Sequence, residues 1–319
     1  MKFGYDEAGD LFSMKTVAAA IEFGTSKIVT LLAESSGISN LGCNIIGSGT
    51  VPYAGYIDAG WNEPEGLFDA IERSIRAAEK EAKRSIHDIY VGVPCENILV
   101  RTAVAEVDVQ HADGRITPED INNVMDAAAD ELQLAEMGNI VLHRSPAWFS
   151  VDNGEKHTMS PQNFRGSKLK ALVSFIVADP GFVEDVRGIL GELGITVNAF
   201  LAPTLGTALL LVPFDERDRM PVVLLDAGYL NTELSVVQGD GITYHAVLPM
   251  GGVDITMALS EALGIDMKKA EGIKRKYNFN SDDSDGNTDC ELQYSDGTVI
   301  NVPRKFVDSA VTNECREIK

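Results

Sequence analysis

The sequence lacks the features of membrane-spanning and secreted proteins. Its longest apolar stretches stop far short of the roughly 20 residues that a spanning helix needs. The first ten residues carry three acidic side chains and no apolar segment of a signal peptide. The four cysteines are scattered, without a CxxC pair, which is typical of free cytosolic thiols. These absences predict a cytoplasmic protein, peripheral to a membrane at most.

Positive charge is also scarce. The 319 residues include 27 Lys and Arg against 48 Asp and Glu, a formal net charge of −21. Such a surface repels nucleic-acid phosphates and anionic lipid headgroups, so nucleic-acid binding is not expected. Any contact with a membrane would need a dedicated apolar or basic element. The length and the 45% hydrophobic content suffice for two ordinary domains.

No hydrolase constellation is visible, because the five histidines are dispersed and neither a serine nucleophile elbow nor a carboxylate dyad occurs. The first candidate site is therefore a turn. Apolar segments 17–21 and 28–33 predict two strands, joined by Glu22, Phe23, Gly24, Thr25 and Ser26. Glycine lets backbone N–H groups approach a phosphate, and hydroxyls add donors. An ordinary hairpin turn remains the alternative.

The second half of the chain repeats this opening. Segment 222–225, the turn Asp226-Ala227-Gly228 and segments 233–238 and 242–248 again predict strands separated by glycine-containing turns. Repetition of one unit at the start of both halves indicates an internal duplication. Two acid-x-Gly turns facing across a cleft would hold the phosphates of one nucleotide from both sides.

Two further features of the second half are ambiguous. Gly251-Gly252 ends a predicted strand and opens a helix, so it is either a close-packing corner or a helix N-terminus directed at a ligand. Glu271 and Lys274 share one helix face, where most such pairs are solvated partners. They would otherwise reach a ribose or an adenine.

The pattern of elements predicts an inserted module. Residues 63–83 predict a helix, and 97–178 has its own strand–helix–strand–strand order, with Thr117 and Pro118 opening its helix. Residues 215–219 predict a charged turn between the two halves. We expect a hairpin at 290–302 around Asp296-Gly297, then a helix over 304–318.

At this point the sequence resembles the actin-like ATPase superfamily and, within it, the FtsA family of bacterial cell division. Residues 21–27 resemble its phosphate-1 motif, 225–228 with Thr232 its phosphate-2 motif, and 248–252 the strand-to-helix turn that follows. Residues 270–274 are similar to the helix whose Glu and Lys face the nucleoside. The module at 97–178 lies where FtsA carries its 1C subdomain.

The resemblance implies duplicated actin-like, ribonuclease H-like α/β domains with an inserted 1C-type α+β module. The expected boundaries are a flexible extension at 1–14, domain 1 at 15–96 and 179–214, the module at 97–178, and an incomplete domain 2 at 215–319. The implied cofactor is ATP with magnesium, and Asp226 and Glu22 would hold the metal through water. The implied nucleotide-binding residues are Glu22, Gly24, Thr25, Ser26, Lys27, Asp226, Gly228, Thr232, Gly251, Gly252, Glu271 and Lys274.

Three departures from the family motifs point the same way. Phosphate-1 usually opens with Asp, but here with Glu22. Tyr229 and Leu230 stand in phosphate-2 where the family has glycine, so side chains replace bare backbone. The connecting helix usually starts Glu-Pro, and that Glu helps to place the attacking water, but position 202 is Ala. We therefore predict weak nucleotide binding and weak or absent hydrolysis.

The resemblance also implies partners. These are the C-terminal tail of FtsZ, further copies of the chain in filaments, and other division proteins through the 97–178 module, at the inner face of the membrane at the division site. The family's second glycine-rich turn and its membrane-lying helix have no counterpart in residues 1–319, so we expect an incomplete chain without its membrane anchor. A PilM-like pilus or secretion adaptor and an active actin-like ATPase remain alternatives.

Overall fold

The chain folds into two compact units. The computed structural model describes residues 17–35, 42–53, 56–57, 60–61, 63–136, 138–154, 157–277, 289–293 and 299–317. The first unit comprises residues 1–225 and 233–247, and the second comprises 226–232 and 248–319. The extension expected at 1–14 lies outside the described residues. The domain boundary expected at residue 215 stays a prediction, because this division instead leaves most of 215–247 with the first unit.

A five-stranded mixed sheet organises the first unit, in the order β10-β6-β1-β2-β3. β1 pairs antiparallel with β2 and β2 with β3, whereas β6 runs parallel to both β1 and β10. This is the ribonuclease H-like arrangement that the sequence predicts. The strands are β1 (Val17–Phe23), β2 (Lys27–Ser35), β3 (Cys43–Pro52), β6 (Asp88–Gly92) and β10 (Thr196–Leu201).

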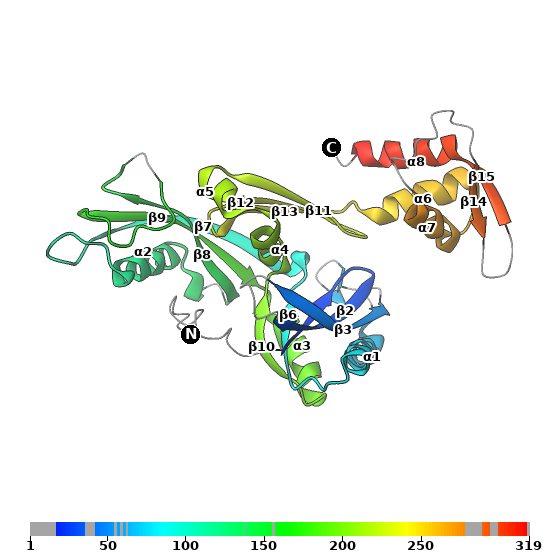
Figure 1. Cartoon of the computed structure of the whole chain (residues 1–319), viewed down its shortest axis with the longest axis horizontal. Helices are drawn as coiled ribbons and strands as arrows, with labels where there is room; N and C mark the ends of the chain where they lie inside the picture. The colour runs from blue at the N-terminus through cyan, green and yellow to red at the C-terminus, as the bar shows by residue number, and fades with distance from the viewer. Residues whose placement is uncertain are drawn as a thin grey trace. The chain divides into compact units, whose positions relative to one another are not determined.

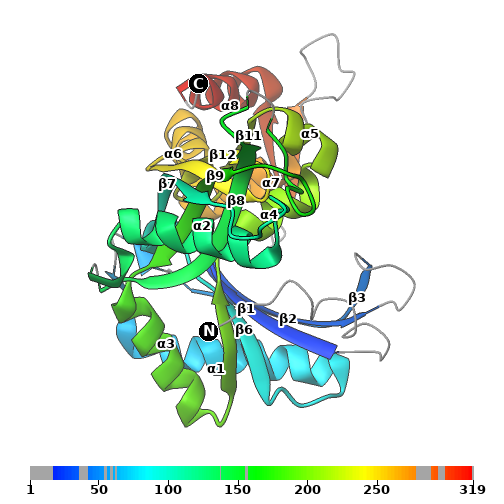
Figure 2. The same ribbon diagram turned by 90° about the vertical axis from the view of Figure 1, so that its left-hand side faces the viewer.

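Two helices cover one face of this sheet, α1 (Pro64–Ala82) and α3 (Pro180–Glu192). Figure 2 shows both on the same side. Burial alternates along β1, where Ile21 and Phe23 are buried and Glu22 between them is exposed, as the period of a strand requires. The buried face and the two helices share one apolar core. Glu22 therefore points away from this core.

The approach of α1 to β3 depends on glycine. A Cβ added at Gly49 would lie 1.8 Å from the carbonyl oxygen of Ser74, and one at Gly47 would lie 2.4 Å from that of Ala78. Both obstacles are helix backbone, which has little freedom to move. The two glycines thus set how closely helix and strand pack.

The inserted module lies between β6 and α3 and has its own core. Its three-stranded antiparallel sheet has the order β7-β9-β8. Helix α2 packs on one face of this sheet, as Figure 1 shows. The strand–helix–strand–strand order predicted from the sequence is confirmed. The elements are β7 (Ile98–Asp108), α2 (Pro118–Glu131), β8 (Ile140–Val151) and β9 (Lys168–Ala178).

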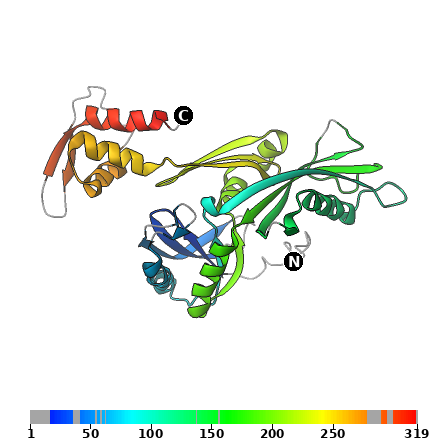
Figure 3. The same cartoon turned by 180° about the vertical axis from the view of Figure 1, so that it is seen from behind.

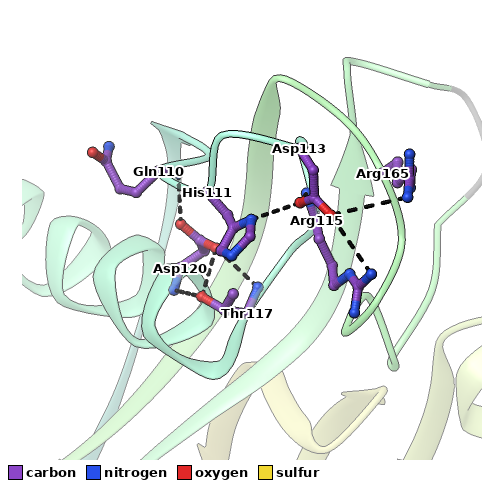
Figure 4. A network of polar contacts seen from close by, with 7 residues as sticks. All are labelled: Gln110, His111, Asp113, Arg115, Thr117, Asp120 and Arg165. Atoms are coloured by element: carbon purple, nitrogen blue, oxygen red, sulfur yellow. Dashed lines mark hydrogen bonds and ion pairs between the residues drawn. The ribbon is translucent and has the colours of Figure 1, made fainter.

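A capping box opens α2, as the sequence predicts. The side chain of Thr117 accepts a hydrogen bond from the backbone N–H of Asp120, and the Asp120 carboxylate accepts one from the N–H of Thr117 at 2.9 Å. The N–H of Gln110 also donates to Asp120, at 3.0 Å. Figure 4 shows this network beside a second carboxylate, Asp113, whose partners are His111, Arg115 and Arg165.

The charged turn predicted at 215–219 is wrong, because these residues form the short helix α5 (Phe214–Arg219). Its Arg217 is buried, donates to the carbonyl of Gly239 at 2.9 Å and pairs with Asp240 at 3.0 Å. Contacts with a turn more than 20 residues away thus hold the helix. This information is absent from the local sequence.

Three strands follow α4 (Pro203–Leu211) and α5, in the sheet order β11-β12-β13. They repeat the consecutive order of β1, β2 and β3, in line with the predicted duplication. The turn between the last two packs on the inserted module, where the N–H of Asp240 donates to the carbonyl of Pro146 at 3.0 Å. The strands are β11 (Val222–Ala227), β12 (Thr232–Gln238) and β13 (Gly241–Leu248).

The second unit contains a group of three helices and a hairpin with a small core of its own. Figure 3 shows α8 beside α6. The predicted hairpin is confirmed as β14 with β15, although its turn at 296–297 lies outside the described residues.

In the described part of the chain, no helix combines the length and apolarity needed to cross a bilayer. The elements are α6 (Gly252–Leu263), α7 (Met267–Lys276), β14 (Asp289–Gln293), β15 (Val299–Pro303) and α8 (Arg304–Glu317). In the first unit, β4 (Tyr56–Ile57) and β5 (Gly60–Trp61) pair antiparallel in a separate two-stranded sheet.

Candidate nucleotide-binding segments

The first predicted phosphate turn joins β1 to β2 in the first unit. The N–H of Gly24 donates to the carbonyl of Lys27 at 2.9 Å, which closes a tight turn. The carbonyl of Ser26, within this turn, accepts a hydrogen bond from the N–H of Tyr53 at 3.2 Å. Tyr53 directly follows β3, so the end of β3 supports the turn. Thr25 lies half-buried between Gly24 and Ser26. The sequence thus correctly locates a strand–turn–strand unit here.

Glu22 lies where three segments of the first unit meet. A Cβ added at Gly92, the last residue of β6, would lie 2.9 Å from the Pro203 ring and 3.6 Å from Cγ of Glu22. The ends of β1 and β6 and the start of α4 therefore converge. The glycine at 92 is required by this approach. An exposed carboxylate at such a point has the hard oxygen donors that Mg²⁺ prefers.

The start of α4 carries no carboxylate. Ala202 is buried, and its N–H donates to Nε2 of His143 at 2.9 Å. Burial lowers the pKa of His143, so its imidazole is neutral at pH 7 and able to accept this bond. The backbone N–H of residue 202, where the resembled family has Glu, is thus hydrogen-bonded to a histidine of the inserted module.

A half-buried carboxylate that the sequence does not predict lies next to this point. Glu233 on β12 accepts a hydrogen bond of 2.5 Å from Thr204 and lies 3.4 Å from Nε2 of His245. Burial raises its pKa, but hydrogen bonds from His245, Thr204 and Cys95 outweigh burial and lower it. Burial, with the neighbouring Glu233, raises the pKa of the Cys95 thiol.

This cluster links the segment after β6, the start of α4, and strands β12 and β13. Glu233 and Ser235 alternate with Leu234 and Val236, so two polar side chains share one face of a predicted strand, and this was the available sequence signal. The signal indicates a buried polar contact. It does not identify the contact's partners, which lie 12 to 138 residues away along the chain.

The second predicted phosphate turn belongs to the second unit. Asp226 is exposed near the end of β11, and the N–H of Gly228 donates to the carbonyl of Asn231 at 2.8 Å. Thr232 is fully buried, and its hydroxyl donates to the carbonyl of Met250 at 2.7 Å. The hydroxyl of Thr232 thus joins the turn to the segment that precedes α6.

Gly251 and Gly252 pack directly on this turn. The N–H of Gly252 donates to the carbonyl of Gly228 at 2.9 Å, and that of Val253 to the carbonyl of Tyr229 at 2.8 Å. A Cβ at Gly251 would lie 2.5 Å from the Tyr229 carbonyl oxygen. The contacts in the structure are those of a close-packing corner. Two N–H groups of the first turn of α6 are thereby satisfied by the chain itself.

Glu271 and Lys274 pair on α7 at 2.7 Å. The same oxygen of Glu271 accepts a hydrogen bond from the hydroxyl of Thr256 on α6, also at 2.7 Å. Burial raises the pKa of Glu271, but hydrogen bonds from Lys274, Thr256 and Arg275 outweigh it and lower the pKa to about 2. The Glu271 carboxylate is therefore ionised at neutral pH, and its bond to Thr256 fixes α7 to α6.

The predicted binding residues thus divide between the two units. The structure brings together Gly228, Gly251, Gly252, Glu271 and Lys274 within the second, whereas Glu22 to Lys27 form the turn of the first. Within the described residues there is no cluster of three or more metal-binding side chains. A magnesium ion carried by nucleotide phosphates needs only one or two carboxylates, so Glu22 and Asp226 are chemically suitable donors.

Family comparisons agree with this architecture. The profile described as "SHS2 domain inserted in FTSA" matches residues 96–177, which is the inserted module. The profile described as "Cell division protein FtsA" matches residues 223–305, from β11 to α8. The chain is an FtsA-like protein.

Curated relatives of this FtsA-like chain support the assignment. It is 27% identical over 257 residues to the cell division protein FtsA of Pseudomonas aeruginosa, which covers 81% of this chain and 60% of that protein. It is 24% identical over 263 residues to FtsA of Escherichia coli K12, covering 82% and 61%. The FtsA-like chain therefore spans about three fifths of the length of these relatives.

Solved structures establish the actin-like fold. The FtsA-like chain superposes on a protein of the "PilM-PilN type IV pilus biogenesis complex" with a TM-score of 0.58 and 15% identity, over 96% of this chain and 74% of that one. At this identity the similarity concerns the fold. The predicted fold class, actin-like domains with an inserted 1C-type module, is confirmed.

Proposed function

We propose that this FtsA-like protein is a scaffold of bacterial cell division that links FtsZ filaments to the cytoplasmic membrane. The observation that carries the proposal is the pair of profile matches: an SHS2 domain inserted in FtsA at residues 96–177, followed on the same chain by the FtsA profile at residues 223–305. It would bind the C-terminal tail of FtsZ through the second domain. It would associate with further copies, and with other division proteins through the module at 97–178, at the inner face of the membrane at the division site.

Adenine nucleotide with magnesium would act on this scaffold as a conformational ligand. Asp226, Gly228, Thr232, Gly251, Gly252, Glu271 and Lys274 would contribute from the second unit, and Glu22, Gly24, Thr25, Ser26 and Lys27 from the first. Asp226 and Glu22 would hold the magnesium ion through water molecules. Weak binding fits the contacts within the second unit, since Gly252 and Lys274 already have partners there.

Weak or absent hydrolysis is the second part of this proposal. Phosphoryl transfer depends on a group that orients the attacking water. Position 202 offers a buried methyl group, and its N–H is bound to His143. The assay is single-turnover release of phosphate from radiolabelled ATP. Turnover that depends on Asp226, at rates of an ordinary ATPase, would overturn this part of the proposal.

Peptide binding tests the division role. We expect a fluorescent peptide of the FtsZ C-terminal tail to bind the chain with an anisotropy change, and a scrambled peptide of the same composition to leave anisotropy unchanged. The similarity to a structure of the PilM-PilN complex favours one competing candidate, a pilus-assembly adaptor. Binding of the PilN peptide, without binding of the FtsZ tail, would support that alternative.

A further inference from the structure

The ammonium group of Lys274 is surrounded by groups of its own unit. Its Nζ donates to the carbonyl of Gly252 at 2.7 Å and pairs with Glu271 at 2.7 Å. It also lies 5.3 Å from the ring centroid of Tyr229, within the range of a cation–π contact. Only 18% of the Lys274 side chain is exposed. The cation is thus already bound on three sides.

The backbone at Tyr229 is held in place. Its carbonyl accepts the N–H of Val253 at 2.8 Å, and the preceding carbonyl, of Gly228, accepts that of Gly252. Gly251 packs so closely that an added Cβ would lie 2.5 Å from the Tyr229 carbonyl oxygen. The turn is therefore clamped on the start of α6. A clamped backbone limits where the ring can go, so the ring–ammonium contact costs little further ordering.

Position 229 lies where the resembled family has a glycine that bares the backbone. A glycine has no ring to offer, and Lys274 would then have only Gly252 and Glu271 as neighbours from this set. The substitution therefore adds a ligand for the same cation that the proposed nucleotide would contact. A nucleoside that contacts Lys274 would therefore compete with an aromatic face for one ammonium group.

We propose that Tyr229 is a built-in competitor of the nucleoside end of an adenine nucleotide. It occupies Lys274 while the site is empty and must leave it when the nucleoside binds. This inference rests on the proposed nucleotide role of the second unit. It concerns adenosine itself and not only the phosphates, because the contact that Tyr229 makes is with the residue expected to face the nucleoside.

The test compares Tyr229→Ala with Tyr229→Phe by calorimetry, with adenosine and with ATP–Mg²⁺ as titrants. Alanine removes the ring but keeps the carbonyl that binds Val253, and phenylalanine keeps the ring face. A cation–π contact is weakest where it is exposed and strongest where it is desolvated. Loss of this one contact as a competitor should therefore tighten binding by about 2- to 30-fold. We expect Y229A to gain this for both titrants and Y229F to bind as the unmodified protein does.

A double-mutant cycle assigns the gain to Lys274. In the background of Lys274→Ala, Y229A should tighten adenosine binding by less than twofold. Circular dichroism checks that each variant keeps its helices. A gain with ATP but none with adenosine would show that Tyr229 obstructs phosphates, and would overturn the inference.

Two further outcomes separate this inference from the proposed function. Equal affinity of Y229A and the unmodified protein for both titrants would overturn the inference and leave the nucleotide role intact. If no protein binds ATP or adenosine even at millimolar concentration, the inference and the nucleotide role both fail. Anisotropy of the FtsZ tail peptide on the same samples reports the division role independently.

Discussion

The substitution Glu271→Gln tests the polar contact that joins α7 to α6. The carboxylate pairs with Lys274 and accepts a hydrogen bond from Thr256, each at 2.7 Å, and Arg275 adds a bond at 2.9 Å. Its side chain is 22% exposed, so solvent screens the charge only partly. Glutamine keeps the size and one acceptor oxygen but removes the charge. The variant thus isolates the charged part of the interaction.

The magnitude follows from the pKa of Glu271, which falls from 4.5 to about 2 on folding. That difference corresponds to about 3 kcal/mol of the free energy of unfolding at neutral pH, at about 1.4 kcal/mol per pH unit. The folded-state pKa is depressed, so this contribution is present above pH 4.5 and is lost as the pH falls toward 2. At pH 3 about 1 kcal/mol remains. Partial screening makes both figures upper values.

Hydrogen exchange of amides in α6 and α7 measures this loss in the second unit. We expect faster exchange in E271Q, corresponding to a destabilisation of about 2–3 kcal/mol at pH 7 and about half of that at pH 3. Both tryptophans, Trp61 and Trp148, belong to the first unit, so their fluorescence during denaturation is an internal control. Glu261→Gln, at an exposed position of α6, is the matched substitution and should leave exchange unchanged.

Two results would refute this reasoning. One is an E271Q variant whose α6 and α7 amides exchange as in the unmodified protein at pH 7, because the charged contacts would then contribute nothing. The other is a difference that stays constant from pH 7 to pH 3, since a depressed pKa requires the difference to shrink. Equal changes in E271Q and E261Q would assign the effect to net charge instead.

Three further predictions concern the first unit. Gly49→Ala should destabilise it by about 3 kcal/mol or more, because the new Cβ would meet the backbone of Ser74 at 1.8 Å, whereas Gly66→Ala on α1 has open space and should be neutral or stabilising by denaturant titration. Thr117→Ala should cost about 1 kcal/mol by loss of the α2 cap, measured by chemical denaturation at pH 7. Cys95, whose pKa is raised by burial and by Glu233, should react with iodoacetamide far more slowly than the exposed cysteines, as peptide mass spectrometry will show.

Local signals were sufficient for much of the fold. The cap at Thr117 and Pro118, the alternation in β1 and the glycine after α3 at 194, with φ of +74°, are each decided within a few residues. Helix α5 was missed because its stability comes from Arg217 binding a distant turn. The candidate site divides in the same way. The two acid-x-Gly turns were visible in the sequence, whereas Glu233 was not.

The sequence by itself determined the strand–turn–strand units, the place of the inserted module and the substitutions at positions 22, 202 and 229, because each is a matter of residue type at a given spacing. Only the tertiary structure decided which donors and acceptors were already used. The N–H of Gly252 meets the carbonyl of Gly228, and Lys274 meets the carbonyl of Gly252 and the ring of Tyr229. The physical reason is that a hydrogen bond or a cation–π contact depends on distances of a few ångströms between segments that are far apart along the chain.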